Sequence, residues 1–374
     1  MGNRGAKEMH GLVVGPFPPP IGGDTVLTAN LFKSRYWRDH GARLERVDVS
    51  PRAGIRVPDE RLHRRDVQRG ARILSEVLWK LPRTDFVLLW GNSRFISTVG
   101  LAIVCACAAL RRPVFVKPFG SSLGERISHT PSPWREVILS VLRRSTRLLP
   151  ETHSLASEFV EQLTLPKERV LWLPSFLPDT ALGETRPARR FTGRCAFFGH
   201  VKKEKGVFDI VEALKVRPAL SCDFYGPLLD RDREAFLSEI SKTPNLGYRG
   251  VLESSQVRDA MRRYDALLLP TYHSGEGYPA VVLEAFASGL PVVASRWRSL
   301  PEIIEDGVNG LLVPPQAPQR LREALDRLAM DAPLYEALSA NAFERAKSFS
   351  ESSIVDGVLI PNVESALRRG GVRE

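Results

Sequence analysis

The sequence contains little cysteine, and its few cysteines show no pattern typical of disulfides or metal sites. All of them lie within apolar stretches, and none has the spacing of a metal-ligand pair. Such thiols most often fill a hydrophobic core, so we expect no disulfides and a protein from a reducing compartment. The four cysteines are Cys105, Cys107, Cys195 and Cys222.

Long hydrophobic runs are also missing. The longest apolar stretch, 101–110, is shorter than the roughly 20 residues that a membrane-spanning helix needs. The N-terminal residues lead directly into the apolar run 11–14, without the hydrophobic segment of a signal peptide. We therefore expect a cytoplasmic protein.

Two common ligand signatures are absent as well. The Gly/Pro-rich turn after the first apolar run does not read Gly-x-Gly-x-x-Gly, which argues against a dinucleotide fingerprint. No Asp-x-Asp pair occurs at a convincing strand end. We expect neither a metal site nor a bound cofactor.

Length and charge indicate two domains with different surfaces. A chain of 374 residues exceeds the size at which a single core keeps growing. The net charge is +10, and up to Pro187 there are 28 Lys and Arg against 18 Asp and Glu. From Ala188 onward the counts are 25 and 25, so the first half carries the whole excess. A basic surface suits nucleic acid, anionic membrane or a phosphorylated acceptor, but no nucleic-acid module accompanies it.

The most informative stretch is 267–294. Apolar runs at 266–269 and 291–294 predict buried parallel strands, and 280–288 predicts the helix between them. Within this unit, Glu276 and Glu284 are separated by seven residues, and Gly277, Tyr278 and Pro279 follow the first carboxylate. A helix that starts at this proline would direct free N–H groups at an anion such as phosphate. Carboxylates accept hydrogen bonds from hydroxyls, so the pattern suggests a sugar nucleotide.

The complete string resembles the E-x7-E signature of the family-4 retaining glycosyltransferases. It includes Glu276, Gly277, Glu284, Ala285, Gly289 and Pro291 in register. The resemblance implies the GT-B fold, an α/β architecture of two facing Rossmann-like domains with parallel sheets. It also implies a C-terminal helix that crosses back to the first domain, here 353–374.

The domain boundaries that follow are 1–177 for an acceptor-binding domain and 191–352 for a nucleotide-sugar-binding domain. The proline-rich segment 178–190 reads as the linker between them.

Loops in the first half resemble two further family elements. The turn 15–24 looks like the family's loop with paired glycines, here Gly22 and Gly23, that approaches donor phosphates and acceptor. After the strand expected at 113–116, the family often has a histidine before glycine, where this chain has Phe119 and Gly120. Gly120 and Ser121 are then the expected backbone donors.

The loop 199–206 resembles the family's phosphate loop. Lys205 matches its lysine, and His200 stands in place of the usual arginine, so Lys202 or Lys203 is expected to supply that charge. The resemblance assigns Lys205 and Glu276 to catalysis. It assigns the following residues to donor binding: Glu284, Gly277, Tyr278, Pro279, His200, Lys202, Gly226 and Val251.

The implied activity is metal-independent transfer of a hexose-type sugar, with retention, from a nucleoside-diphosphate sugar. UDP is favoured over GDP, and the acceptor is a glycan or lipid-linked molecule of cell-surface polysaccharide or lipopolysaccharide synthesis. A nucleotide-sugar epimerase and a non-catalytic sugar-nucleotide-binding protein remain as alternatives.

Two groups of arginines in the first half favour attachment to the cytoplasmic face of an anionic membrane. They are Arg61, Arg64, Arg65, Arg69 and Arg72 in the helix expected at 59–80, and Arg135, Arg143, Arg144 and Arg147 in the helix expected at 134–147.

Overall fold

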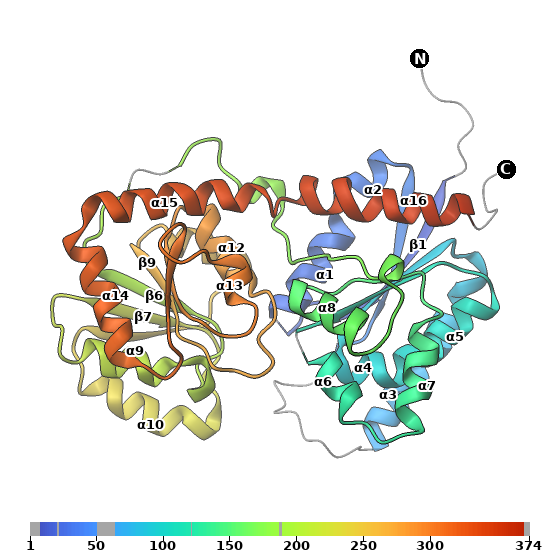
Figure 1. Cartoon of the computed structure of the whole chain (residues 1–374), viewed down its shortest axis with the longest axis horizontal. Coiled ribbons are helices and arrows are strands. Elements are labelled where there is room, and N and C mark those ends of the chain that lie inside the picture. Colours follow the sequence, from blue (N-terminus) through green and yellow to red (C-terminus); the bar gives the residue numbers. More distant parts are fainter. Residues whose placement is uncertain (1–7, 21, 51–63, 121, 187–188, 370–374) are drawn as a thin grey trace. The chain divides into compact units, whose positions relative to one another are not determined.

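The chain folds into two compact units (Figure 1). A computed structural model describes residues 8–20, 22–50, 64–120, 122–186 and 189–369. Unit 1 combines the residues up to Ser175 with those from Glu351 onward, and unit 2 is Phe176–Ser350. Each unit contains one parallel sheet with helices, so the predicted Rossmann-like α/β class is confirmed.

The segment 178–190, predicted as a linker, belongs to unit 2 at its described positions. Arg189 donates hydrogen bonds to the backbone oxygens of Ser288, at 2.9 Å, and Tyr264, at 2.5 Å. Its guanidinium therefore attaches this segment to the body of unit 2.

The sheet of unit 1 has five parallel strands in the order β2-β1-β3-β4-β5. Its central strands are apolar and buried along almost their whole length, as parallel strands covered on both faces must be. The strands are β1 (Met9–Gly15), β2 (Ala42–Asp48), β3 (Phe86–Asn92), β4 (Val114–Phe119) and β5 (Arg147–Leu148).

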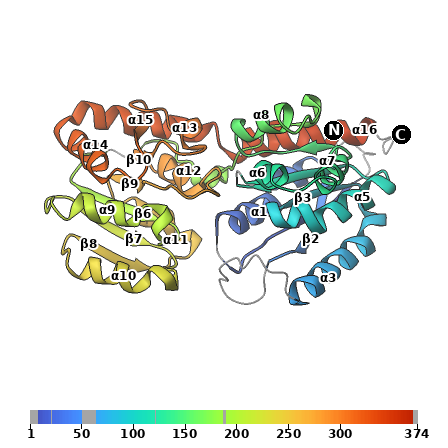
Figure 2. The same ribbon diagram turned by 60° about the horizontal axis from the view of Figure 1, so that its bottom comes forward.

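Helices cover both faces of this sheet. Figure 2 shows α3, α5 and α7 in the same unit as the sheet, and Figure 1 shows α1 and α2 on the opposite side from them. A π-helical turn, Ile96–Gly100, joins α4 to α5. The helices are α1 (Gly23–Lys33), α2 (Arg35–Asp39), α3 (Arg64–Lys80), α4 (Ser93–Phe95), α5 (Leu101–Ala109), α6 (Leu123–Ser128), α7 (Trp134–Leu142) and α8 (His153–Glu161).

Ser34, whose ψ is an extended 128°, separates α1 from α2. One helix predicted for unit 1 is shorter than expected. The helix expected at 134–147 ends at Leu142, because Arg147 pairs with Phe115 as part of β5. Val170 pairs with Leu148 in a single parallel bridge. Arg61 and the expected helix start at 59 lie outside the described residues.

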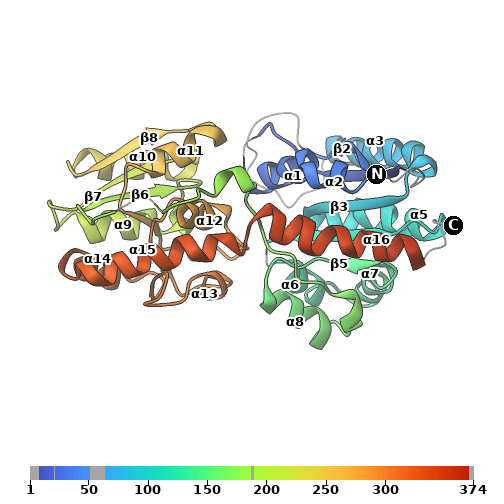
Figure 3. The same cartoon turned by 90° about the horizontal axis from the view of Figure 1, so that it is seen from above.

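The C-terminal segment packs on unit 1. A π-helical stretch, Ser352–Leu359, continues into α16 (Ile360–Arg369), and Figure 3 shows α16 lying along this unit near α2. His40, just after α2, bonds Asp356 through Nε2 at 2.8 Å and Glu364 through Nδ1 at 3.0 Å. The crossing helix implied by the resemblance is therefore present.

The sheet of unit 2 has six parallel strands in the order β11-β10-β9-β6-β7-β8. The strands β6 and β9 are neighbours in the sheet. From β6 the chain adds β7 and β8 on one side, and from β9 it adds β10 and β11 on the other side, so the strand order reverses between β6 and β9. The strands are β6 (Arg194–Phe198), β7 (Ser221–Tyr225), β8 (Leu246–Gly250), β9 (Ala266–Leu269), β10 (Val292–Ser295) and β11 (Gly310–Val313).

The helices of unit 2 form two groups. The helix α9 packs with α14, and α12 packs with α11 and α15. They are α9 (Val207–Leu214), α10 (Asp230–Ser241), α11 (Ser254–Met261), α12 (Ala280–Ala287), α13 (Leu300–Ile303), α14 (Pro318–Met330) and α15 (Ala332–Lys347). Within the described ranges, none of the helices combines the length and the apolar character needed to cross a membrane.

We predict that His40 makes the stability of the chain depend on pH. Burial alone would lower the pKa of His40, but its bonds to Glu364 and Asp356 outweigh burial and raise it above 6.5. The stabilisation is therefore complete below pH 6.5 and is lost as the pH rises through the folded-state pKa. Because the side chain is 33% exposed, we expect a contribution below about 1 kcal/mol.

Urea unfolding of the wild type and of His40→Asn near pH 5.5 and pH 8.5 measures this contribution, with the exposed His129→Asn as the control. The difference between wild type and His40→Asn should shrink toward high pH. A difference that stays constant across this range would contradict the assignment.

Candidate functional site

The candidate site of unit 2 lies where the strand order reverses. Ligands of open α/β sheets bind outside the carboxyl ends of the strands at such a point. The loops that follow the two strands there, β6 and β9, are 199–206 and 270–279. They contain most of the residues predicted to form the site.

A buried ion pair joins these two loops. Lys205 Nζ lies 2.7 Å from both carboxylate oxygens of Glu276, and Thr271 Oγ1 donates to Glu276 Oε2 at 2.6 Å. Burial would raise the pKa of Glu276, whose residue is only 4% exposed, but Lys205 and the Thr271 hydrogen bond more than offset it and lower the pKa. The carboxylate is therefore ionised at neutral pH.

The backbone of the two loops is also joined. Tyr272 N donates to Glu204 O at 2.8 Å. Gly206, which caps α9 with φ +74°, lies so close to Pro270 that an added Cβ would stand 2.1 Å from its carbonyl oxygen. Only glycine fits this left-handed, close-packed position, so the loop that carries Lys205 can rest directly on the end of β9.

Side chains at the end of β10 and directly after it hold the loop of Glu276 from the other side. Ser295 donates to Thr271 O, Trp297 Nε1 donates to His273 O at 2.9 Å, and Ser299 donates to Gly277 O. Three carbonyls along one loop thus have side-chain partners. This fixes the backbone that presents Glu276.

The site has an excess of positive potential. Burial, followed by the charges of Lys205 and Lys202, lowers the pKa of His200. Burial and the same two lysines lower the pKa of His273 to about 4, so both histidines are neutral at pH 7. The pKa of Lys202 is itself lowered by burial and by Lys205. An anion bound here would relieve this repulsion between cations.

The charges of the side chains in the predicted phosphate loop, 199–206, can now be compared. His200 stands beside Lys205 and Lys202 but carries no charge at neutral pH, because burial and those lysines oppose its protonation. The Nζ of Lys202 lies 3.4 Å from Nδ1 of His273. Of the two lysines expected to supply the charge of the missing arginine, Lys202 is partly buried beside Lys205, whereas Lys203 is exposed. Lys202 is therefore the better candidate.

The start of α12 presents backbone rather than side-chain groups. Pro279 is the residue before the first helical residue, and no side chain caps the helix. Tyr278 is 4% exposed, and its ring packs against Phe349 at 5.8 Å between centroids. Its side chain thus belongs to the core of unit 2, and its part in ligand binding would come from the backbone.

Glu284 lies one turn further along α12 and is half-buried. Burial raises its pKa to about 7, while Arg258 acts in the opposite direction. A carboxyl group held this far above its ordinary pKa is costly to ionise in the empty protein. Hydroxyl donors from a ligand would stabilise its charged form.

The remaining donor-site candidates lie at the ends of β7 and β8. Gly226, with φ +129°, packs on Gly199, where an added Cβ would stand 2.0 Å from the carbonyl oxygen. Its own carbonyl accepts a hydrogen bond from the hydroxyl of Tyr248 at 3.0 Å. Val251 follows β8 and is 59% exposed.

Two candidates in unit 1, Gly22 and Gly23, follow β1 and so also lie at a reversal of strand order, between β1 and β3. Gly22 precedes α1 with an extended φ of −165°, and its N–H donates to Thr25 Oγ1 at 3.0 Å. A Cβ built on Gly23 would meet no heavy atom within 4 Å, so the described residues leave open space there. Ser121 lies outside the described residues.

A buried ion pair supports the neighbouring loop of unit 1. Gly120 N donates to Glu151 Oε2 at 3.1 Å, so this expected backbone donor is already engaged. Lys117 Nζ lies 3.5 Å from Glu151 Oε1 and donates to Leu173 O. Burial lowers the pKa of Lys117, and Glu151 opposes that effect.

Sequence reasoning missed several of these residues. Thr271 and His273 lie in the loop between β9 and α12, and their polar side chains close to Glu276 were the available signal. Lys117 and Glu151 are 34 positions apart, and only the pairing of β4, which contains Lys117, with β5, which precedes Glu151, links them. Among the residues with described positions, no group of His, Cys, Asp and Glu side chains has an arrangement that could hold a metal ion.

Comparison with known proteins shows a family match within unit 2. Residues 194–345 match the family "Glycosyl transferases group 1". The chain is 39% identical over 98 residues to D-inositol 3-phosphate glycosyltransferase of Actinosynnema mirum, a match covering 26% of this chain and 23% of that protein. It is 25% identical over 238 residues to alpha-D-kanosaminyltransferase of Streptomyces kanamyceticus, covering 59% and 60%.

The similarity to solved structures covers both units. The crystal structure of Anabaena HepE in complex with UDP and glucose superposes with a TM-score of 0.72 at 17% identity, over 96% of this chain and 100% of that one. At this identity the likeness shows the shared fold. The matches to the curated relatives named above span 23% and 60% of their own lengths, so the sequence similarity covers only part of those proteins.

We predict that replacing Glu284 by glutamine stabilises the chain at high pH. The pKa of Glu284 is raised to about 7, so its contribution is complete below pH 4.5 and is lost as the pH rises through 7. Glu284→Gln should therefore match the wild type near pH 5 and exceed it near pH 8.5 by about 1–2 kcal/mol. Urea unfolding at the two pH values measures the difference.

The control is Glu212→Gln on the exposed side of α9, where the side chain is 54% exposed. It should change stability little at either pH. A Glu284→Gln variant that is less stable than the wild type at pH 8.5 would contradict the assigned pKa.

Proposed function

We propose that this chain, whose residues 194–345 match the glycosyl transferases group 1 family, is a retaining glycosyltransferase. It would transfer a hexose-type sugar from a nucleoside-diphosphate sugar to an acceptor. The observation that carries the proposal is the pair of Lys205 and Glu276 at the reversal point of unit 2, beside Lys202 and an uncapped helix start.

In the proposed reaction, the bond between the anomeric carbon and the diphosphate oxygen breaks. An acceptor hydroxyl oxygen bonds to that carbon on the same face, and its proton passes to the departing diphosphate. Negative charge then accumulates on the departing diphosphate. Lys205 is held by Glu276, and Lys202 lies in the same electropositive loop. Cations that are already in place where charge develops lower the barrier without reorganising, and this is often the largest catalytic contribution.

The other donor contacts follow from position. The free N–H groups at the start of α12 suit a phosphate, and Glu284 suits the hydroxyls of the ribose or sugar. Glu276 holds Lys205 and offers carboxylate oxygens close to the reacting groups. Gly226 and Val251, at the ends of β7 and β8, are proposed to contact the base.

We propose UDP as the nucleotide and GDP as the second choice. The support is the Gly277-Tyr278-Pro279 sequence and the UDP bound to HepE, a protein of the same fold. The proposed acceptor is a glycan or a lipid-linked molecule of cell-surface polysaccharide or lipopolysaccharide synthesis. In unit 1, the open space at Gly23 leaves room for part of it.

Membrane attachment at the cytoplasmic face is part of the proposal. On α3, the side chains of Val67, Leu78 and Trp79 are 62%, 46% and 67% exposed. Arg65 and Arg72 on the same helix are exposed too. Apolar and cationic side chains together suit an interface with anionic lipid.

The test of the activity begins with thermal shifts in a panel of UDP- and GDP-sugars, followed by nucleoside-diphosphate release with and without lipid-linked and glycan acceptors. We expect a UDP-sugar to stabilise the protein and acceptor to accelerate release. Conversion of the donor sugar without release would instead indicate an epimerase. Stabilisation without any reaction would indicate a non-catalytic binding protein.

We predict that Lys205→Met lowers turnover more than it weakens donor binding. An interaction that strengthens as the leaving group gains charge acts on kcat, whereas one made equally with bound substrate acts on KM. We expect kcat to fall by about 10²–10³-fold and the donor KM to change less than about tenfold. Steady-state kinetics of diphosphate release provides both values.

Lys203→Met is the matched control, because Lys203 is exposed in the same loop and should leave kcat nearly unchanged. Circular dichroism must show that Lys205→Met is folded, since Glu276 loses its buried partner. A Lys205→Met variant with unchanged kcat and raised KM would assign Lys205 to ground-state binding only.

A further inference from the structure

The phosphate loop 199–206 of unit 2 contains an acidic residue among its lysines. Glu204 stands between Lys203 and Lys205. Burial opposes the ionisation of Glu204, but a backbone N–H hydrogen bond and the charge of Arg231 outweigh burial and lower its pKa. The loop therefore carries its own carboxylate at neutral pH. A carboxylate is an anion like phosphate, so it can compete with a bound diphosphate for the same cations.

The backbone of Glu204 has a fixed position. Glu204 is the middle residue of a short 3₁₀ turn, Lys203–Lys205, and its carbonyl oxygen accepts a hydrogen bond from Tyr272 N at 2.8 Å. Tyr272 belongs to the loop that carries Glu276. Because the backbone is held between these two loops, a change of partner at Glu204 involves only its side chain.

Lys202 is the cation that Glu204 would otherwise neutralise. Burial and Lys205 lower the pKa of Lys202, and the charge of Glu204 opposes them, so the two side chains interact across the loop. In the part of the chain that the structure describes, however, Lys202 is paired with no carboxylate. Its Nζ lies 3.4 Å from Nδ1 of the neutral His273. The charge of Lys202 thus remains available to an anionic ligand.

The carboxylate of Glu204 pairs with Arg231 instead. Nη2 of Arg231 lies 2.5 Å from both carboxylate oxygens of Glu204, and its Nε lies 3.4 Å from Asp232 Oδ2. Arg231 and Asp232 both lie in the first turn of α10. Asp232 Oδ2 also accepts a hydrogen bond from Lys203 N at 3.1 Å. The start of α10 therefore holds the backbone of the phosphate loop and its acidic side chain together.

The connection from β7 to α10 fixes Arg231 beside the phosphate loop. Val201 N donates to Pro227 O at 2.8 Å, and Leu229 N donates to Val201 O at 3.2 Å. Val201 and Leu228 form a parallel bridge in this way. Since Arg231 comes two residues after Leu229, the start of α10 is attached to the loop along the backbone as well as through side chains.

We propose that Arg231 is a positioning residue for the donor: it holds the carboxylate of Glu204 away from Lys202, so that Lys202 is open to the diphosphate. Without Arg231, Glu204 turns toward Lys202 and competes with the ligand. An exposed ion pair adds little stability, so the role of this pair is to select between two partners of Glu204. The inference rests on the proposed glycosyl transfer and adds a residue that acts on the donor through another side chain.

Isothermal titration calorimetry of the whole chain with UDP-glucose and with inorganic diphosphate tests this role. Low ionic strength is used, because exposed charges are then least screened. Arg231→Gln should raise the Kd of both ligands about fivefold, and Arg231→Lys, which keeps the charge, should raise it less. Glu204→Gln should bind both ligands at least as tightly as the wild type. The double variant should match Glu204→Gln within about twofold, because the competing carboxylate is gone.

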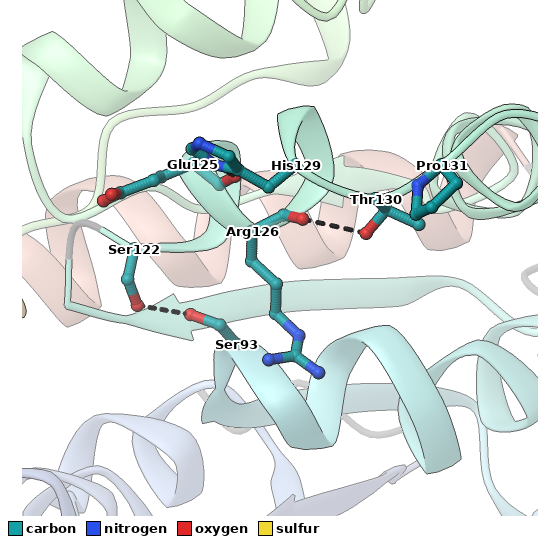
Figure 4. Close-up of a pocket in the computed structure, with 7 residues that line it drawn as sticks. All are labelled: Ser93, Ser122, Glu125, Arg126, His129, Thr130 and Pro131. Carbon is teal, nitrogen blue, oxygen red and sulfur yellow. Dashed lines mark hydrogen bonds between the residues drawn. The ribbon is translucent and has the colours of Figure 1, made fainter. Parts of the chain in front are cut away.

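Arg233→Gln is the matched control on α10. The side chains of Arg231 and Arg233 are both 51% exposed, but Arg233 pairs with Asp230, which lies outside the phosphate loop. A second control, Arg126→Gln, changes the net charge equally in unit 1, where Figure 4 shows the carboxylate of Glu125 pointing away from the Arg126 guanidinium. Neither control should change either Kd by more than about twofold.

Two outcomes would overturn the inference: unchanged affinity in Arg231→Gln, or a double variant as weak as Arg231→Gln, which would show that Arg231 does not act through Glu204. The two ligands separate this inference from the proposed function. If no sugar nucleotide of the panel binds but inorganic diphosphate shows the expected pattern, the glycosyl transfer is wrong and the role of Arg231 stands. If UDP-glucose binds equally well to Arg231→Gln, the role of Arg231 alone is wrong. Failure of the wild type to bind any of these ligands would remove both.

Discussion

The site of unit 2 depends on the contact between Lys205 and Glu276. Each residue lies in a loop after one of the two central strands, and the contact forms only when both loops take their observed paths. A buried ion pair is a weak source of stability, because removing two charges from water offsets much of their attraction. We therefore infer that the main role of Glu276 in this pair is to hold the charge of Lys205 in place. The backbone supports this view, since Tyr272, Gly206 and Ser295 all act to fix the same two loops.

The pKa directions at this site share two causes, burial and the charges of the lysines. Burial lowers the pKa of His200, His273 and Lys202 most, Lys205 and Lys202 lower the pKa of both histidines further, and Lys205 also lowers that of Lys202. Glu276 neutralises only part of this charge. The protein thus holds cations close together at an electrostatic cost, and a bound diphosphate would relieve their repulsion. The neutral histidines remain able to take part in hydrogen bonds without adding to the cost.

The sequence was sufficient for local features and for motifs within one loop. Apolar runs such as 266–269 located buried strands, and the spacing from Glu276 to Glu284 located the candidate site. It was insufficient where the outcome depends on packing between distant segments. Nothing local shows that Tyr278 turns its ring toward Phe349, or that Arg147 joins β4 instead of extending α7.

The sequence also could not predict the charge states of the site residues or which charged residues form pairs. His200 could be placed in the phosphate loop from its position, but its neutrality results from burial beside two lysines. The partner of Lys117 is Glu151, and their separation along the chain conceals the pair. Burial and long-range contacts set both features, so they become visible only after the fold is known.

The two units use the same topological position for different chemistry. In unit 2, the strands at the reversal point lead to Lys205 and a buried carboxylate, which suit a ligand of high charge. In unit 1, they lead to open space at Gly23 and to the hydroxyl of Ser93, which suit a neutral polar ligand. A transferase needs both, because the departing group carries charge and the attacking group is a hydroxyl. The contrast follows from the residues after equivalent strands, so one fold repeated in the chain can present two different kinds of ligand site through its loops alone.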